Sequence, residues 1–411
     1  MHILWVKTEL LHPVDKGGRI RTYNMLRALR REHRITYVTL DDGQAAPDAV
    51  ERASEYADHL VRVPFSAAPK RSPRFYGELL ANVFSRLPYA VAKYRSPALR
   101  KAIEDLVARG DVDVVVCDFL APSLNVSARL PVPTVLFQHN VEAMIWRRHA
   151  EVAHGGIARR YFREQWRRME AFERSECRRF DHVIAVSAED RDVFRNTYGV
   201  TDATDVPTGV DVEFFRPSGA VQREPLDMVF TGSMDWLPNE DGILWFADEI
   251  LPRIRSRVPG ATLTVVGRNP PARIRALAER DPLLRVTGTV PDVRPYIERA
   301  AVFVVPLRIG GGTRLKIFEA MAMERAVVST VVGAEGLPVT DGGDLLLADA
   351  PDDFAGAVAT LLEQPARTAA LGASGAHLVR TSFGWDRVAD IFAEQCARAA
   401  GERSITLTGR S

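Results

Sequence analysis

Cysteine, long apolar runs and charge of one sign are all scarce in this sequence of 411 residues. Its three cysteines form no Cys-x-x-Cys pair and leave an odd count, so we expect neither a disulfide framework nor a thiolate metal site. With 54 Lys and Arg against 53 Asp and Glu, the net charge of +1 lacks the basic excess that nucleic-acid-binding proteins carry. No nucleic-acid partner is therefore expected.

The longest apolar runs, at residues 114–117 and 300–307, are only as long as a β-strand. Near the amino terminus, Lys7 and Glu9 interrupt the first apolar run after four residues. We expect neither a signal peptide nor a transmembrane helix, because both need longer apolar segments. These absences predict a cytoplasmic protein whose membrane contact, if it has one, is peripheral and on the inner face of the membrane.

Two common phosphate-binding loops are also missing. The sequence has no Gly-x-Gly-x-x-Gly after an early strand and no Gly-x-x-x-x-Gly-Lys-Ser/Thr. Both loops place backbone N–H groups around a phosphate. Their absence argues against a nicotinamide-dependent dehydrogenase and against a P-loop nucleoside triphosphatase.

What the sequence does contain is an alternation of short β-branched runs with longer helical stretches, the pattern of parallel sheets covered on both faces. This predicts an α/β fold with two Rossmann-like domains facing each other across a cleft. We expect the domains at 1–206 and 207–384, and a C-terminal helix and tail at 385–411 that pack on the first domain. The expected strands are 3–6, 35–40, 60–63, 112–117, 134–138 and 183–186, then 227–231, 262–266, 285–288, 302–306, 327–330 and 345–347.

The segment PLRIGGGTRLKIFEAMA, residues 306–322, has the strongest chemical pattern. A buried strand ends in Gly310, Gly311 and Gly312, and Thr313 is placed to cap the next helix. Unpaired N–H groups at a helix start bind anions, and glycines allow a phosphate to come close to the backbone. Arg314 and Lys316 can add charge-assisted contacts. We therefore predict an anion site here.

Glu319 is an unusual residue for the middle of this apolar helix, where an unpaired carboxylate would cost several kcal/mol. It needs a partner, and the vicinal hydroxyls of a ribose next to the phosphates would serve. The structural alternatives are an i,i+3 ion pair with Lys316, or a helix-capping glycine run without a ligand.

The quoted segment resembles the second domain of the retaining glycosyltransferases of family four, which have the two-Rossmann GT-B fold. GGGTRLKIFEAMAMERAVVST, with VTGTVPDVRPYIERAAVFVVPLR before it and GAEGL after it, carries the resemblance. It extends to VFTGSMDWLPNEDGILWF in the same domain and to KGGRIRTYNMLRAL in the first domain. Nearly the whole chain is covered.

The resemblance implies that Glu319 holds the ribose of a nucleotide-sugar donor. The family's second glutamate, eight positions earlier, is replaced by Gly311. The Arg and Lys that often bind the diphosphate are missing from GSMDWLPN, so Arg314, Lys316 or Arg268 would supply the positive charge. The matching segments also assign donor contacts to three further residues: Gly232, Ser233 and Val290. Asn239 is best explained as a helix N-cap without a catalytic role.

In the first domain, Gly17 and Gly18 lie between a strand and a helix and could present N–H groups to the donor. Alternatively, these glycines serve a loop with positive φ. His139 follows a strand at the carboxyl edge where ligands of α/β proteins collect, and it resembles the family's cleft histidine. A lone histidine can also be structural. His139 and Glu319 are the residues expected to serve the reaction directly.

Two basic stretches remain. Residues 70–95 carry six cations against one acid, interleaved with aromatic and aliphatic side chains, a mixture that could lie on an anionic bilayer. Residues 146–179 hold ten arginines against five glutamates and read as a long helical segment. For this second stretch a solvated helix face is the favoured interpretation.

Taken with the resemblance, these features predict an enzyme that moves a hexosyl group from a nucleotide-diphospho-sugar to a hydroxyl of a glycan or lipid-linked acceptor, with retention. The nucleotide-sugar is a substrate, and no cofactor is expected. No metal is expected either, because carboxylates do not cluster with histidines at ligand spacing. Two alternatives stay open: a GT-B nucleotide-sugar 2-epimerase, and a non-catalytic protein that binds nucleotide-sugars.

Overall fold

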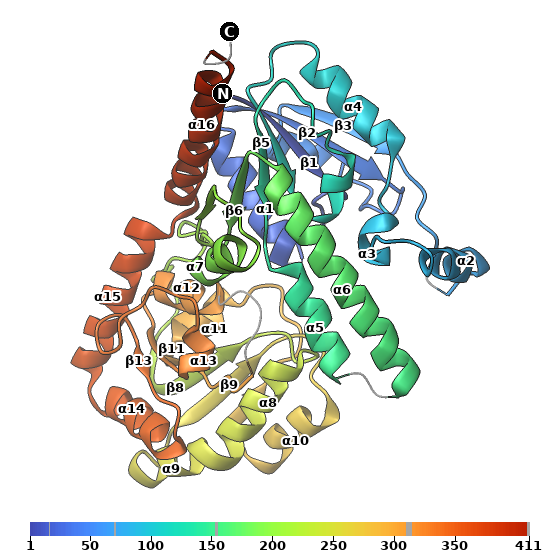
Figure 1. Ribbon diagram of the computed structural model, residues 1–411. Helices are drawn as coiled ribbons and strands as arrows, with labels where there is room; N and C mark the ends of the chain where they lie inside the picture. Colours follow the sequence, from blue (N-terminus) through green and yellow to red (C-terminus); the bar gives the residue numbers. More distant parts are fainter. Residues whose placement is uncertain (16, 70, 153–154, 310–314, 409–411) are drawn as a thin grey trace. The chain divides into compact units, whose positions relative to one another are not determined.

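The computed structural model describes residues 1–15, 17–69, 71–152, 155–309 and 315–408 (Figure 1). Its internal packing divides the chain into two units. Unit 1 comprises Met1–Thr208 and Val388–Ser411, and unit 2 comprises Gly209–Arg387. The boundaries fall two or three residues after those expected at 206/207 and 384/385.

Unit 1 is built on a seven-stranded parallel sheet in the order β3-β2-β1-β4-β5-β6-β7. Its central strand β1 pairs with β2 on one side and β4 on the other, so that Ile3 lies opposite Ile35 and Val114. Parallel strands end at one common edge, called the carboxyl edge below. The strands are β1 (His2–Lys7), β2 (Arg34–Asp41), β3 (His59–Pro64), β4 (Val114–Asp118), β5 (Thr134–Phe137), β6 (His182–Ala185) and β7 (Ala203–Asp205).

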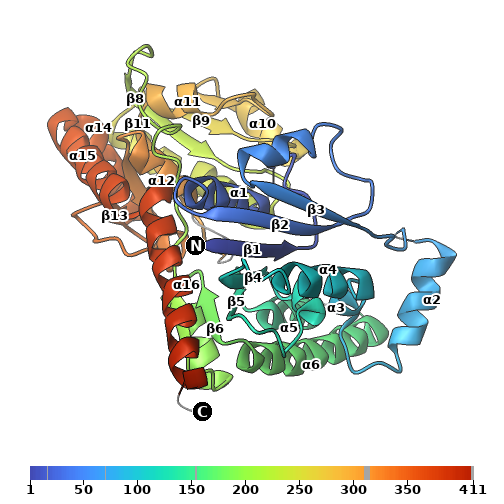
Figure 2. The ribbon, with the colours of Figure 1, turned by 90° about the horizontal axis from the view of Figure 1, so that it is seen from above.

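Helices cover both faces of this sheet. One face packs Leu4 and Val6 against α4 and α6, and the other face carries Trp5, whose ring lies 5.4 Å from Phe392 of α16. Figure 2 shows α5 and α6 side by side and α2 standing apart from the sheet. The helices are α1 (Gly17–Leu29), α2 (Pro73–Asn82), α3 (Tyr89–Ala92), α4 (Pro97–Val107), α5 (Glu142–Val152), α6 (Gly156–Arg179), α7 (Ala188–Asp192) and α16 (Trp385–Thr408).

Local sequence signals explain where several of these helices begin. Ser72-Pro73 and Ser96-Pro97 each place a serine before a proline at the first helical position. The Ser72 hydroxyl accepts from the backbone N–H of Phe75 at 3.1 Å, and the Ser96 hydroxyl accepts in the same way at the start of α4. A proline loses nothing here because its missing N–H would have had no partner in the helix.

Unit 2 holds a six-stranded parallel sheet in the order β10-β9-β8-β11-β12-β13. Its strands are β8 (Glu224–Thr231), β9 (Thr262–Val266), β10 (Leu284–Val286), β11 (Ala300–Val305), β12 (Ala326–Ser329) and β13 (Leu346–Leu347). Its helices are α8 (Leu237–Trp245), α9 (Leu251–Arg257), α10 (Ala272–Arg280), α11 (Arg294–Arg299), α12 (Leu315–Ala322), α13 (Val331–Ala334), α14 (Pro351–Glu363) and α15 (Pro365–Ser382).

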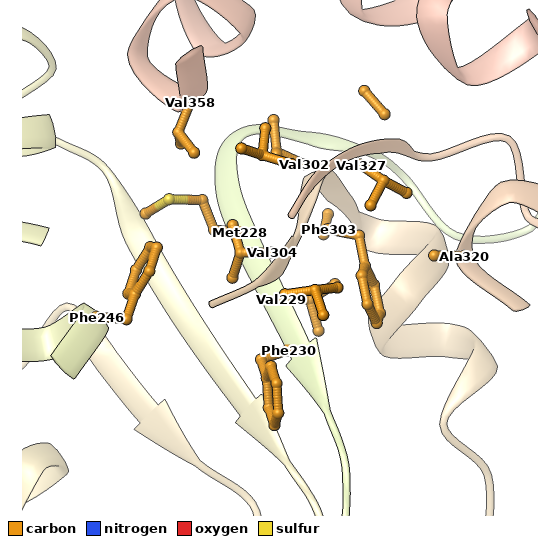
Figure 3. Close-up of a cluster of buried hydrophobic side chains, with 14 of the residues drawn as sticks. Met228, Val229, Phe230, Phe246, Val302, Phe303, Val304, Ala320, Val327 and Val358 are labelled. Atoms are coloured by element: carbon orange, nitrogen blue, oxygen red, sulfur yellow. The ribbon is translucent and has the colours of Figure 1, made fainter. Parts of the chain in front are cut away.

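The core of unit 2 explains why its strands read as unbroken apolar runs. Figure 3 shows Met228, Phe230 and Phe303 of the two central strands among side chains from the helices. These three side chains are fully buried, and each contributes about 1.5–3 kcal/mol by leaving water. A parallel sheet covered on both faces needs apolar side chains at successive positions, not at alternating ones.

The structure confirms all twelve expected strands, with ends shifted by up to three residues. The strand expected at 112–117 begins only at Val114, and the one expected at 302–306 begins at Ala300. Strand β7 was not predicted, because its three residues give no measurable alternation. None of the helices that the structure describes is both long enough and apolar enough to cross a lipid bilayer.

Candidate functional site

The predicted anion site begins with five residues that lie outside the described part of the chain: Gly310, Gly311, Gly312, Thr313 and Arg314. Their donor-binding roles, including the cap expected of Thr313, stay predictions. The description resumes at Leu315, where α12 begins. From there, Lys316 and Glu319 can be placed.

Lys316 lies at the carboxyl edge of the unit 2 sheet. Its Nζ donates to Oδ1 of Asn239 at 2.9 Å and lies 4.2 Å from the ring centroid of Phe230, the second-last residue of β8. A Cβ added at Gly232 would come within 2.8 Å of this Nζ. Gly232 is therefore needed for the close approach of the ammonium group to the backbone.

Asn239 has a different role from the N-cap that was expected. Helix α8 begins at Leu237 with Trp236 at its N-cap, so Asn239 lies inside the first turn. Its Nδ2 donates to the backbone oxygen of Ser233 at 2.9 Å, while its Oδ1 accepts from Lys316. The N-cap prediction was wrong because the N-cap lies three residues earlier, with Pro238 in the first turn of the helix.

Two loops join at this edge. The N–H of Gly232 donates to the backbone oxygen of Val266 at 2.9 Å, and the N–H of Met234 donates to the backbone oxygen of Arg268 at 3.0 Å. These bonds bring Ser233 and Arg268, both predicted from the sequence, to the same place. The Arg268 guanidinium is half-exposed and lies 3.7 Å from Asp235.

Val290, the remaining predicted donor contact in unit 2, is partly buried against the core of that unit. No contact in the structure joins its side chain to Lys316 or Glu319 among the residues described. Its role at the donor stays a prediction.

Glu319 is half-buried on α12 and forms no hydrogen bond or ion pair with any residue that the structure describes. Burial raises the pKa of Glu319 to about 7, and the charge of Lys316 offsets part of that rise. The expected alternative was an ion pair with Lys316. Instead, the Lys316 ammonium donates to Asn239. No residue in the described part of the chain donates a hydrogen bond to the Glu319 carboxyl group.

At the carboxyl edge of unit 1, a buried charge pair joins the ends of two strands. Lys7, the last residue of β1, donates to Oδ2 of Asp118, the last residue of β4, at 2.8 Å. Trp5 and Thr22 donate to the same oxygen at 3.0 and 2.6 Å. Burial alone would raise the pKa of Asp118, but the charge of Lys7 and the contacts with Lys7 and His139 hold it below its ordinary value.

His139 belongs to this buried network. Its Nε2 lies 2.8 Å from Oδ1 of Asp118, and its ring stacks on Phe119 with centroids 3.9 Å apart. Burial lowers the pKa of His139 to about 3, although Asp118 opposes that shift. The imidazole is therefore neutral at pH 7 and enclosed, and its direct role in the reaction stays a prediction.

Gly17 and Gly18 form the first turn of α1 rather than the loop before it. Gly18 has no positive φ, so the positive-φ alternative was wrong for this glycine. A Cβ at Gly18 would come within 2.9 Å of the Phe119 ring, so close approach explains this glycine. Phe119 itself has a φ of +73°, a strained value for a bulky residue, and its ring centroid lies 4.3 Å from Lys7 Nζ.

Sequence reasoning missed Lys7, Asp118 and Phe119. A signal was present, because a single charge ends each of two apolar strands, ILWVK and VVVCD. Charged residues at such places are buried only when they are paired.

Two Asp-x-Asp triplets occur in the chain, at 111–113 and 190–192. In the first, Asp113 accepts from the backbone N–H of His2 at 2.6 Å and Asp111 pairs with Arg34. In the second, Asp192 pairs with Arg191. Within the described ranges, no group of three or more His, Cys, Asp or Glu side chains could hold a metal ion.

Two protein-family models match the chain. The model of "Glycosyltransferase Family 4" matches residues 16–214, and that of "Glycosyl transferases group 1" matches residues 225–364. These matches are 199 and 140 residues long, and together they cover 339 of the 411 residues. The chain therefore carries a family 4 glycosyltransferase domain followed by a group 1 glycosyl transferase domain. The resemblance seen in the sequence is confirmed.

Relatives of this chain share part of their length with it. A "D-inositol 3-phosphate glycosyltransferase 2" of Catenulispora acidiphila is 29% identical over 245 residues, which are 53% of this chain and 56% of the relative. A "GDP-mannose-dependent alpha-(1-6)-phosphatidylinositol monomannoside mannosyltransferase" of Mycobacterium tuberculosis is 29% identical over 51% of this chain and 60% of the relative. The chain thus matches little more than half of the length of these relatives.

Solved structures agree on the fold. Sucrose-phosphate synthase of Thermosynechococcus elongatus matches over 100% of both chains with a TM-score of 0.67 and 18% identity. HepE of Anabaena, in complex with UDP, matches over 97% of this chain and 100% of its own, with a TM-score of 0.66 and 13% identity. At such identities the likeness establishes the fold alone. The predicted GT-B class of two Rossmann-like α/β domains is confirmed.

Proposed function

We propose that this protein transfers a hexosyl group from a nucleotide-diphospho-sugar to a hydroxyl of a glycan or lipid-linked acceptor, with retention of configuration. The matches to two glycosyltransferase models support the reaction class. The relatives' names, which include a GDP-mannose-dependent enzyme with a lipid-linked acceptor, support the donor and acceptor classes.

The observation that carries the proposal is the carboxylate of Glu319. It is half-buried, its pKa is raised to about 7 by burial, and it has no bonded partner among the described residues. A buried acceptor without a donor is costly, and a ligand that supplies two hydroxyl donors removes that cost. The adjacent hydroxyls of a ribose fit this need, with Lys316 close by for the phosphates.

In the proposed reaction, the bond between the sugar's anomeric carbon and the diphosphate oxygen breaks, and the diphosphate leaves with the electron pair. The acceptor oxygen forms its bond to the same carbon on the same face and passes its proton to the leaving phosphate. Lys316 stabilises the negative charge that develops on the diphosphate. We expect this to need no metal, so activity should survive EDTA, and a strict requirement for magnesium or manganese would contradict that expectation.

The test of the ribose contact compares a nucleoside diphosphate with its 2′-deoxy analogue. The parent should bind the deoxy form at least tenfold more weakly, because a hydrogen bond to a charged group is worth about 1.5–3 kcal/mol. Glu319→Gln should weaken binding of the parent ligand by about tenfold and should discriminate much less between the two forms. Equal discrimination by both proteins, measured by calorimetric titration, would remove Glu319 from the site.

A product assay completes this test. Transfer of radiolabelled sugar to an added acceptor is the expected result. An epimerised nucleotide-sugar formed without any acceptor would instead favour the 2-epimerase. Binding without turnover of any kind would favour the non-catalytic protein.

We further propose that α2 attaches the protein to an anionic membrane surface. Its exposed apolar side chains are Tyr76, Leu80 and, just after the helix, Val83 and Phe84, and Phe84 is 90% exposed. Arg168 of α6 donates to the backbone oxygens of Asn82 and Val83 at 2.7 and 3.1 Å, which fixes the end of the helix. Exposed aromatics beside basic residues are typical of helices that lie in a bilayer interface.

Sedimentation with vesicles tests the attachment. The parent should pellet with vesicles rich in phosphatidylserine and not with neutral vesicles. Leu80→Ser with Phe84→Ser should abolish most of that pelleting, as should Arg71→Glu with Arg74→Glu. Val50→Ser, which changes a side chain that is 40% exposed elsewhere in unit 1, serves as the control. Equal pelleting of all variants would show that α2 is only a solvated helix.

A further inference from the structure

The loop after β8 carries no positive charge of its own. Residues 232–241 read GSMDWLPNED, with three acidic side chains and no basic one. A diphosphate bound at this edge would need a cation from another segment. Arg273 and Arg308 contact this segment but pair with Glu240 and Asp241. Arg268 and Lys316 lie nearer to the end of β8 and are the two candidates.

These two cations differ in their surroundings. Arg268 is half-exposed and lies 3.7 Å from the carboxylate of Asp235, which compensates its charge. Lys316 Nζ is held instead by a neutral amide, at 2.9 Å from Asn239 Oδ1, and by the face of an aromatic ring. Unlike a carboxylate, a neutral amide acceptor holds an ammonium group in place without adding a negative charge beside it.

Asn239 is itself held in one orientation. Its side chain is buried, with 7% of its surface exposed, and its Nδ2 donates to the backbone oxygen of Ser233 at 2.9 Å. Because a lysine ammonium has only donors and a carbonyl is only an acceptor, the amide oxygen must face Lys316 and the amide nitrogen must face Ser233. The pair of contacts thus sets the position of Nζ.

Gly232 completes the arrangement. A Cβ at this position would come within 2.8 Å of both Lys316 Nζ and Asn239 Nδ2. The absence of a side chain lets the ammonium group lie directly against the backbone at the end of β8. A bound anion at this edge would meet that ammonium group together with the loop's own N–H groups.

We infer that Asn239 is a positioning residue that holds Lys316 over Gly232 as the cation for the donor diphosphate. This inference rests on the proposed function, because it assigns a role at the same donor site. A carboxylate in place of the amide would keep the contact with Lys316, but its negative charge would weaken the binding of a phosphate there. Asn239→Asp therefore separates a positioning role from a merely structural one.

The experiment titrates the protein calorimetrically with UDP and GDP, and with uridine and guanosine as ligands without phosphates. Lys316→Met and Asn239→Asp should each weaken binding of the preferred diphosphate at least tenfold and should leave nucleoside binding within about twofold of the parent. The melting temperature of Asn239→Asp should stay close to that of the parent, because the new pairing with Lys316 offsets the lost donation to Ser233. Asn196→Asp, an exposed change in unit 1, is the matched control and should bind normally.

The outcomes separate the inference from the proposed function. If the parent binds neither diphosphate, the proposed function fails and the inference fails with it. If the parent binds and Lys316→Met binds equally well, Lys316 is not the cation. If Lys316→Met is weakened but Asn239→Asp is not, Asn239 has no positioning role. A loss of nucleoside and diphosphate binding in equal measure would mean that Asn239 only supports the fold of the loop.

Discussion

The carboxyl edges of the two sheets handle charge in opposite ways. In unit 1, Lys7 and Asp118 are buried against each other, and Trp5 and Thr22 complete the bonding of the carboxylate. In unit 2, Glu319 is half-buried without a bonded partner among the described residues. At the first edge the protein's own side chains donate to Asp118, while at the second edge no described residue donates to Glu319. Stability and binding should therefore respond oppositely to substitutions at the two edges.

The largest effect is expected from Asp118→Ala in unit 1. It leaves the ammonium group of Lys7, which is 2% exposed, without its partner, and breaking such a buried pair costs about 3–5 kcal/mol. Chemical denaturation of unit 1 measures the loss. Asp105→Ala is the control, because the Lys101–Asp105 pair is exposed and its removal should change stability far less. Similar losses of stability in both variants would mean that the buried Lys7–Asp118 pair contributes no more than an exposed pair.

A smaller effect is expected from Gly18→Ala. The new Cβ would come within 2.9 Å of Phe119, and the displaced ring would disturb its stacking on His139. Crowding of this kind costs about 1–3 kcal/mol. Gly77→Ala in α2 is the matched control, since nothing lies within 4 Å of its Cβ and alanine favours a helix by about 1 kcal/mol. If both variants gain stability, Phe119 does not constrain the start of α1.

The smallest effect on stability is expected from Glu319→Gln, and its sign depends on pH. The pKa of Glu319 is raised in the folded protein to about 7, so the parent loses stability relative to the variant as pH rises from about 4.5 through 7. At pH 5 the two proteins should melt together. At pH 8 the variant should melt higher, because the parent then carries a partly buried charge that the variant lacks. A variant that melts lower at pH 8 would show that Glu319 has a stabilising partner.

Features that depend on a few neighbouring residues could be predicted from the sequence. The strands of both sheets, the glycines at 17 and 18 and the misplaced charge of Glu319 could all be found from a few neighbouring residues. Contacts between distant residues could not. Lys7 and Asp118 are 111 positions apart, and Asn239 and Lys316 are 77 apart, so neither pair leaves a local pattern. The positive φ of Phe119 had no signal either, because glycine or asparagine is the usual choice there.

Helix α16 packs on unit 1 but is synthesised after unit 2. The ring of Phe392 packs 5.4 Å from that of Trp5 and 5.0 Å from that of Phe137, yet it follows Phe137 by 255 positions, from 137 to 392. A ribosome adds about 5–20 residues each second, so Phe392 is synthesised roughly 10–50 s after Phe137. All of unit 2 is synthesised in that interval. The face of the unit 1 sheet that α16 covers is therefore completed only after all of unit 2 has been synthesised.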